Sequence, residues 1–113
     1  MSVHHDIEAI RKECHDLLGR FPTLQEAYMD YYHATYAPGA LEAKTKHLLA
    51  LCGALVSGCH GCIVGQAERA VEKGATPQEI LETCLVAISL GGTMAWTQTA
   101  RVMHYLKDEG LLD

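Results

Sequence analysis

The chain has 113 residues and a net charge of −5, with 49% hydrophobic and 20% charged residues. This length fits one domain over residues 1–113, and the hydrophobic content argues against disorder. Nine basic residues scattered through an acidic chain are the wrong electrostatic footprint for a nucleic-acid binder. No apolar run approaches the roughly 20 residues of a membrane-spanning helix, and the N-terminus lacks the basic-then-apolar order of a secretory signal. We therefore expect a cytoplasmic protein.

Two helices are predicted in the N-terminal third. Over residues 5–18, apolar side chains recur at helical spacing while polar ones occupy the opposite side, a pattern typical of an amphipathic helix. Thr23 and Glu26 match the capping box, in which each side chain bonds the other residue's backbone amide. This motif predicts a second helix that runs toward Tyr36.

Four further helices follow. Residues 41–57 are apolar almost continuously after a polar start, which predicts a buried core helix. The next helix covers the sequence CIVGQAERAVEK and ends at Gly74. The sequence TPQE then offers a capping threonine, a proline at the first helical position and a glutamate three residues after the cap. Gly91-Gly92 separates this fifth helix from a sixth over residues 93–108.

The pattern as a whole predicts an all-α subunit of six helices, because no segment shows sustained β alternation. A domain of this size has difficulty covering helices that are apolar nearly all round. Assembly into a homo-oligomer is the expected remedy. The alternative is that the first and last helices cover them.

The sequence SGCHGCIVGQ places Cys59 and Cys62 at a predicted helix start. A helix N-terminus stabilises a thiolate, and this spacing lets the two sulfurs bond, so the motif predicts a redox-active dithiol. Five cysteines in a reducing compartment argue against a disulfide framework. Zinc needs four ligands, and no second CxxC or HxxxH appears, so His47 and His60 could complete a site only if both pointed inward. Two inert buried thiols are the other alternative.

The remaining cysteines, aromatic residues and histidines are assigned structural roles. Aliphatic surroundings favour burial of three thiols, those of Cys14, Cys52 and Cys84. A cluster on the second helix could line a pocket or an oligomer interface, but ordinary packing is the preferred interpretation. The cluster is formed by Tyr28, Tyr31, Tyr32, His33 and Tyr36. Four histidines are expected at the surface or in a mobile terminus: His4, His5, His15 and His104.

Several motifs occur in a familiar order between Tyr36 and Leu106. LxxKTK opens a helix, CxxC follows a glycine, EKGATPQEI joins two helices, and an apolar helix ends in GG. This run resembles the carboxymuconolactone decarboxylase / alkylhydroperoxidase AhpD-like family. The resemblance implies an all-α subunit that assembles as a homotrimer or homohexamer.

The resemblance also implies peroxidase or disulfide-reductase chemistry on a small hydroperoxide or disulfide. The cysteine that matches Cys62 attacks as a thiolate and becomes a sulfenic acid, and Cys59 resolves it to a disulfide. A thiol reductant of unknown identity then restores the dithiol. Thiol chemistry favours Cys59, as the more exposed sulfur, for exchange with that reductant. No nucleotide or flavin motif is visible, so no cofactor is expected.

The chain departs from the family pattern at the proton relay. The family carries a glutamate twelve residues before the first cysteine and a histidine four after the second, where this chain has His47 and Gln66. Gln66 can orient a hydrogen bond but cannot take a proton, whereas a histidine at position 47 can act as a base or, when charged, stabilise a thiolate. Some members have a histidine directly before the second cysteine. This chain has Gly61 at that position, and its histidine, His60, is one residue earlier. Either the relay is rewired or it has decayed.

Two other functions stay open. A carboxymuconolactone-decarboxylase-type lyase would need acid–base groups and a cationic anchor for substrate carboxylates. Near the dithiol, four residues qualify: Lys44, Lys46, His47 and Arg69. A non-catalytic oligomeric binding protein is the third hypothesis, because both relay residues are replaced.

Overall fold

The computed structural model describes residues 3–113, and side chains from residue 8 onward, so the assignments for His4 and His5 lie outside the described side chains. Within this range every regular element is a helix, which confirms the all-α prediction. The helices are α1 (Val3–Gly19), α2 (Pro22–Tyr36), α3 (Ala43–Ser57), α4 (His60–Glu72) and α5 (Pro77–Asp108).

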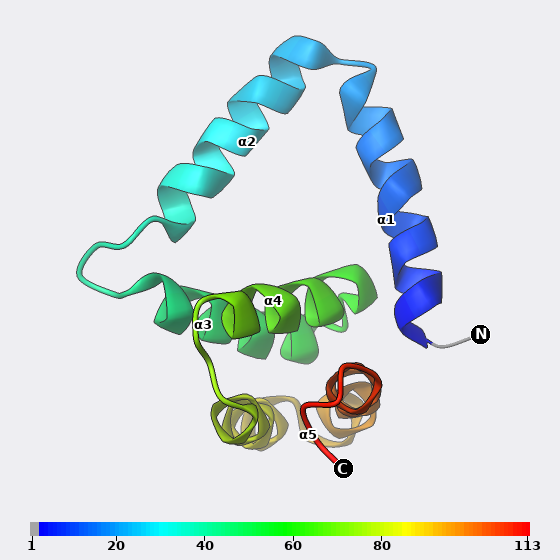
Figure 1. Cartoon of the computed structure of the whole chain (residues 1–113), viewed down its shortest axis with the longest axis vertical. Helices are drawn as coiled ribbons and strands as arrows, with labels where there is room; N and C mark the ends of the chain where they lie inside the picture. Colours follow the sequence, from blue (N-terminus) through cyan, green and yellow to red (C-terminus); the bar gives the residue numbers. More distant parts are fainter. Residues whose placement is uncertain (1–2) are drawn as a thin grey trace.

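The helices form two regions, which we call the body and the arm. The body consists of α3, α4 and α5, with α3 lying beside α4 and both packed on α5. The arm consists of α1 and α2, which meet at an acute angle and close a triangle with the body (Figure 1). One end of the arm contacts α4 and the other continues into α3.

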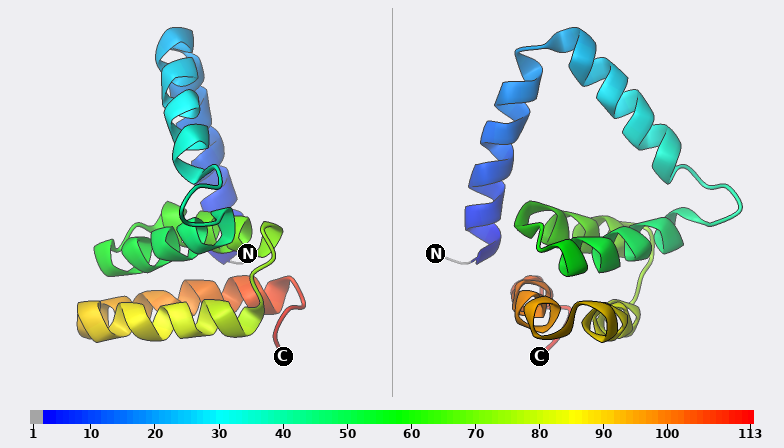
Figure 2. Two further views of the ribbon diagram at one scale, coloured as in Figure 1. Left: turned by 90° about the vertical axis from the view of Figure 1, so that its left-hand side faces the viewer. Right: turned by 180° about the vertical axis from the view of Figure 1, so that it is seen from behind.

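The predicted break between the fifth and sixth helices lies inside α5. Gly92 has non-helical dihedral angles, φ 62° and ψ −146°, and the chain turns back there into two antiparallel halves (Figure 2). The structure therefore has five labelled helices, the last of them folded at the predicted glycine pair. By length and composition α5 would suffice to cross a membrane, but the turn at Gly92 makes it a hairpin. Gly91 is also required, because a Cβ there would lie 2.7 Å from Ala95 Cβ.

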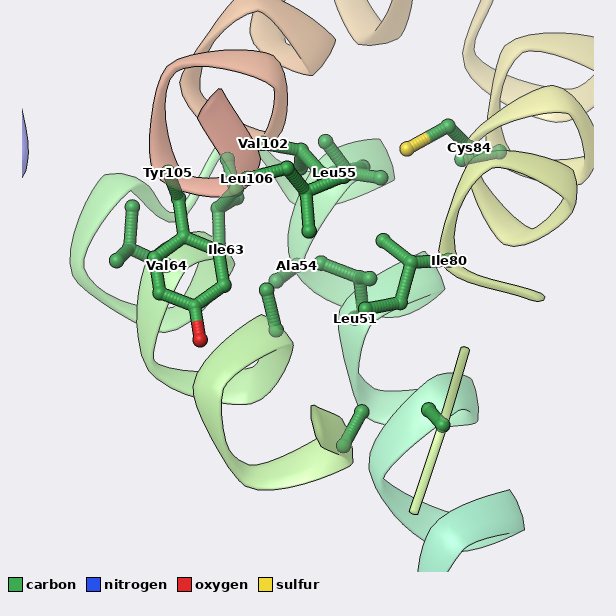
Figure 3. Close-up of a cluster of buried hydrophobic side chains, with 14 residues drawn as sticks. Leu51, Ala54, Leu55, Ile63, Val64, Ile80, Cys84, Val102, Tyr105 and Leu106 are labelled. Atoms are coloured by element: carbon green, nitrogen blue, oxygen red, sulfur yellow. The ribbon is translucent and has the colours of Figure 1, made fainter. Parts of the chain in front are cut away.

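The hydrophobic core lies where α3, α4 and α5 meet (Figure 3). The inward face predicted for α4 is confirmed at Ile63, Ala67 and Ala70, all fully buried. Burying an aliphatic side chain contributes about 1.5–3 kcal/mol, so this region supplies most of the hydrophobic stabilisation. The largest fully buried side chains are Leu51, Leu55, Ile63, Ile80, Leu106, Val64 and Val102.

The two predicted capping boxes have different outcomes. Thr76 accepts a hydrogen bond from the Glu79 backbone N–H at 3.1 Å, and Glu79 Oε1 accepts one from the Thr76 N–H at 2.8 Å. The box predicted at Thr23 is wrong: the N-cap of α2 is Phe21, two residues earlier, and it makes no side-chain capping bond. A proline favours the first helical position, so Pro22 moves the start ahead of Thr23.

Apolar side chains remain exposed in both regions. The helix α3 was expected to be buried on most sides, but Leu49 on it is 58% exposed. Leu85, Val86 and Leu90 on the first half of α5 are exposed as well. The arm has no buried residue among its described side chains. Its exposed apolar residues are Ile10, Leu17, Phe21, Leu24, Tyr28 and Tyr31.

Candidate functional site

The two cysteines lie at the junction of α3 and α4. Gly58 ends α3 in the left-handed conformation, φ 74°, which glycine adopts without a Cβ penalty. Cys59 is the N-cap of α4, and its carbonyl accepts the Ile63 N–H at 2.9 Å. Cys59 and Cys62 form a disulfide with a Cα–Cα distance of 5.3 Å. The turn between the helices thus brings both sulfurs to the N-terminus of α4.

The two sulfurs differ in exposure, in the opposite sense to the prediction. Cys62 is exposed, whereas Cys59 is half-buried and packs against the core cluster. The capping position turns Cys59 toward the core, while Cys62 is on the first turn of α4, away from it. Cys62 is therefore the sulfur that a dissolved molecule reaches more easily.

The two residues at the relay positions are hydrogen-bonded to each other. His47 on α3 places Nδ1 2.7 Å from Gln66 Oε1 on α4. A glutamine oxygen can only accept, so His47 Nδ1 carries the proton in this contact. The Gln66 NH₂ group is then left for another partner. Cys62 is one helical turn before Gln66 on the same face of α4.

His47 is enclosed on its other side by the arm. Its side chain is 2% exposed, and the Tyr36 ring stacks on the imidazole with centroids 4.2 Å apart and an interplanar angle of 5°. Burial raises the pKa of the Tyr36 hydroxyl, and the neighbouring Tyr32, Tyr28 and Tyr31 raise it further. The tyrosine therefore stays neutral and stacks as an uncharged ring.

Two cavities flank the His47–Gln66 pair. A cavity of about 250 Å³ is lined by residues of α1, α2 and α4, among them Cys62, Gln66 and His15. A second, of about 520 Å³, is lined by His47 and by residues of the arm and α4. Met29, Tyr32 and Arg69 line both. The hydrogen bond thus connects His47, in one cavity, with the glutamine beside Cys62 in the other.

His60 lies apart from this arrangement. It is exposed and lines neither cavity, and its Nε2 lies 3.5 Å from Arg101 Nη2 on α5. His47 and His60 consequently do not converge on the cysteines. Over the described part of the chain, no three His, Cys, Asp or Glu side chains come together as metal ligands.

Of the three other thiols, all predicted to be buried, one is buried, one is half-buried and one is exposed. Cys84 is buried in the core (Figure 3), and burial, with Cys52 adding a smaller effect, raises the pKa of its thiol to about 11. Cys52 is half-buried. The expectation for Cys14 is wrong, because its side chain is exposed on α1. The apolar side of α1 that carries Cys14 is open to solvent, since Ile10 and Leu17 on the same side are exposed as well.

The arm brings to the Cys62 cavity residues that no sequence motif had indicated. His15 is exposed, as predicted, but it also lines the Cys62 cavity together with Arg11. Tyr28 and Tyr32 line the same cavity, whereas Tyr31 is 70% exposed. Arg11 and His15 are four residues apart on the polar side of α1, which resembles any solvated helix face, so no sequence signal marked them.

Residues 22–105 match the profile of the Carboxymuconolactone decarboxylase family. The chain belongs to this family. Its similarity to a Paracoccus denitrificans protein called "Uncharacterized protein 4 in cox locus" is 29% identity over 86 residues, 76% of this chain and 78% of that protein. An uncharacterized Cupriavidus necator protein is 25% identical over 84 residues, 74% of each chain.

Solved structures of carboxymuconolactone decarboxylase family proteins share the fold. The apo form of one from Legionella pneumophila superposes with a TM-score of 0.85 at 27% identity, over 94% of this chain and 95% of that one. Another, from Thermotoga maritima, has a suggested involvement in the antioxidative response. It matches with a TM-score of 0.80 at 28% identity, over 93% of this chain and 90% of that one.

Proposed function

We propose that this family member is a thiol-dependent peroxidase or disulfide reductase whose Cys59 and Cys62 alternate between dithiol and disulfide. The observation that carries the proposal is the pairing of the two sulfurs at the N-terminus of α4, with Cys62 open to a cavity. The helix terminus favours the thiolate of Cys62, the form that attacks. The antioxidative response suggested for the Thermotoga maritima relative is in keeping with such chemistry.

In the proposed reaction, the Cys62 thiolate attacks the outer oxygen of a hydroperoxide. The O–O bond breaks, an alkoxide leaves and takes up a proton, and Cys62 becomes a sulfenic acid. Cys59 then attacks the Cys62 sulfur, releasing water and forming the disulfide. A thiol reductant supplies the two electrons that return the pair to the dithiol.

The His47–Gln66 pair takes the place of the usual glutamate and histidine in this proposal. The Gln66 oxygen is held by its hydrogen bond with His47. The amide NH₂ of Gln66 is therefore available to donate to the Cys62 thiolate or to the departing oxygen. His47 lies in the neighbouring cavity and therefore acts through Gln66. The pair positions a donor, whereas the usual pair moves a proton.

The test is disulfide formation in reduced protein after addition of cumene hydroperoxide, mapped by mass spectrometry. Wild type should form the Cys59–Cys62 disulfide, and Cys59→Ser should stop at a Cys62 sulfenic acid that dimedone traps. Cys62→Ser should lose the reaction altogether. A double variant, His47→Glu with Gln66→His, restores the family's usual residues and should keep or raise the rate. Peroxide consumption that is unchanged in Cys62→Ser would overturn the proposal.

The lyase hypothesis has less support from the cationic residues it needs. Lys44 Nζ is paired with Glu79 Oε2 at 3.1 Å. Lys46 Nζ donates to the backbone oxygens of Thr35 and Ala37 at 2.8 and 2.7 Å. Both lysines are thus committed to structural contacts, and only His47 and Arg69 line a cavity.

We also propose that the chain acts in the cytoplasm as a homotrimer or homohexamer. The exposed apolar side chains of the body, at Leu49, Leu85, Val86 and Leu90, would be covered in such an assembly. Light scattering of the purified chain would give its mass in solution. A monomer at micromolar concentration would overturn this assignment.

A further inference from the structure

The cavity beside Cys62 has a cationic lining. Arg11 and His15 on α1 and Arg69 on α4 contribute to its wall, and among the side chains described from residue 8 onward no carboxylate does. The rest of the lining is aromatic, apolar or amide, and it includes Tyr28, Met29 and Tyr32 from α2. This composition differs from that of the whole chain, whose net charge is −5.

Arg11 retains hydrogen-bonding capacity at this wall. Its Nη1 lies 3.5 Å from Glu68 Oε2, a long contact for an ion pair, and its side chain is 28% exposed. Its Nη2 is buried and has no hydrogen-bond partner among the described residues. The guanidinium lies against Gly65 on α4, where a Cβ would be in ordinary contact with Arg11 Nη2 at 3.6 Å. A buried donor without a partner is costly, and a rotation of the guanidinium that brings it to an anionic ligand in the cavity would satisfy it.

Arg69 provides the second positive charge. It follows Cys62 by seven residues, two helical turns along the same face of α4. Its Nη1 lies 3.7 Å from Glu72 Oε1, beyond hydrogen-bond length, and Glu72 does not line the Cys62 cavity. Glu72, outside the cavity, thus neutralises part of the Arg69 charge. The guanidinium still has N–H donors for a ligand in the cavity.

We propose that the Cys62 cavity binds substrates that carry a carboxylate or a similar anionic group, with Arg11 and Arg69 as the binding residues. The inference rests on the proposed function and names its substrate class: an anionic hydroperoxide or disulfide of a size that fits about 250 Å³. The chain's overall negative charge repels such molecules, so a local cationic wall is needed to concentrate them near the thiol. The aromatic side chains of α2 would cover the apolar part of the substrate.

For an anionic disulfide the reaction balances as two exchanges. The Cys62 thiolate attacks one substrate sulfur, the substrate S–S bond breaks, and one substrate thiolate leaves. Cys59, as thiolate, attacks the Cys62 sulfur of this mixed disulfide and releases the second thiolate. The substrate gains two electrons, and the protein dithiol loses them.

The test uses two alkylating reagents that differ in charge, iodoacetate and iodoacetamide. Reduced protein is treated with each, and the rate constants at Cys62 are obtained by peptide mapping. We expect the iodoacetate-to-iodoacetamide ratio at Cys62 to exceed that of the same cysteine in urea-denatured chain. Arg11→Gln or Arg69→Gln should lower the ratio by about two- to tenfold, the effect of removing one charge within roughly 10 Å of the reacting thiol.

The matched control is Lys12→Gln, which removes one positive charge from the residue next to Arg11. Lys12 is exposed and lines neither cavity, so the ratio should stay at the wild-type value. Arg11→Lys retains the charge and should retain most of the ratio. If an arginine variant does not fold, the salt dependence of the wild-type ratio replaces it: a raised ratio should fall toward the denatured value at high salt.

The outcomes separate this inference from the proposed function. A ratio equal to that of the denatured chain, or equal losses in Lys12→Gln and the arginine variants, would overturn the anionic-substrate inference and leave the dithiol chemistry intact. A raised ratio in protein that forms no disulfide with hydroperoxide would retain the anion site and overturn the peroxidase. Cys62 that reacts with neither reagent would overturn both.

Discussion

The body and the arm are both built from α-helices but are stabilised differently. The body buries its apolar stripes in a shared core, whereas the arm buries no described side chain. The arm is nevertheless the region that completes the site, since it contributes Tyr36 against His47 and Arg11 beside Cys62. Stability and the shape of the cavity are thus supplied by different parts of this chain.

The largest contrast should appear on truncating one leucine in each region. Leu55 is fully buried and Leu24 is 62% exposed. Leu55→Ala should lower the free energy of unfolding by about 2–5 kcal/mol, because it removes buried methyl groups and leaves a cavity. Leu24→Ala should change it by less than about 0.5 kcal/mol. Urea unfolding followed by circular dichroism measures both, and equal losses would show that the arm is buried in solution.

A smaller contrast is expected between two thiols at high pH. Burial raises the pKa of Cys84 from 9.0 to about 11. The contribution of the protonated thiol to the free energy of unfolding is therefore fully present below pH 9. This contribution is lost as the pH rises from 9 through 11, and it amounts to at most about 3 kcal/mol. Cys84→Ala should therefore show a shallower loss of stability over this range than wild type. Cys14→Ala, on the exposed arm, should retain the wild-type pH dependence.

The smallest contrast concerns two threonines in identical motifs. Thr76 caps α5 through a reciprocal pair of bonds with Glu79, whereas Thr23 makes no capping bond in α2. Thr76→Ala should cost about 1 kcal/mol of unfolding free energy, and Thr23→Ala a few tenths at most. Thermal unfolding of the two variants measures this. A comparable loss in Thr23→Ala would mean that the α2 start shifts in solution.

The same pair of threonines illustrates what the sequence can predict. In both cases the TxxE pattern located a helix start to within a residue or two, but the cap depended on which side of the threonine the proline lay. Pro77 follows Thr76 and leaves it as the cap, while Pro22 precedes Thr23 and takes the first helical position. Helix boundaries and the Cys59–Cys62 junction were predictable because they depend on local preferences.

The rest of the site depends on contacts between distant segments. His47 and Gln66 are on different helices, and only the family resemblance had placed them at one site. Arg11 and His15 line the Cys62 cavity because α1 packs on α4, a contact that no local pattern encodes. The higher exposure of Cys62 than Cys59 likewise follows from how the α3–α4 turn sits against the core.

The turn at Gly92 also affects how the dithiol can be followed by optical means. A side chain at Gly58, next to Cys59, would contact Met94 just after this turn. Trp96 is the only tryptophan in the chain, is 63% exposed, and comes two residues after that methionine. The fold thus provides a native fluorophore near the dithiol end of the body, where its emission can be recorded during reduction and oxidation without any attached dye.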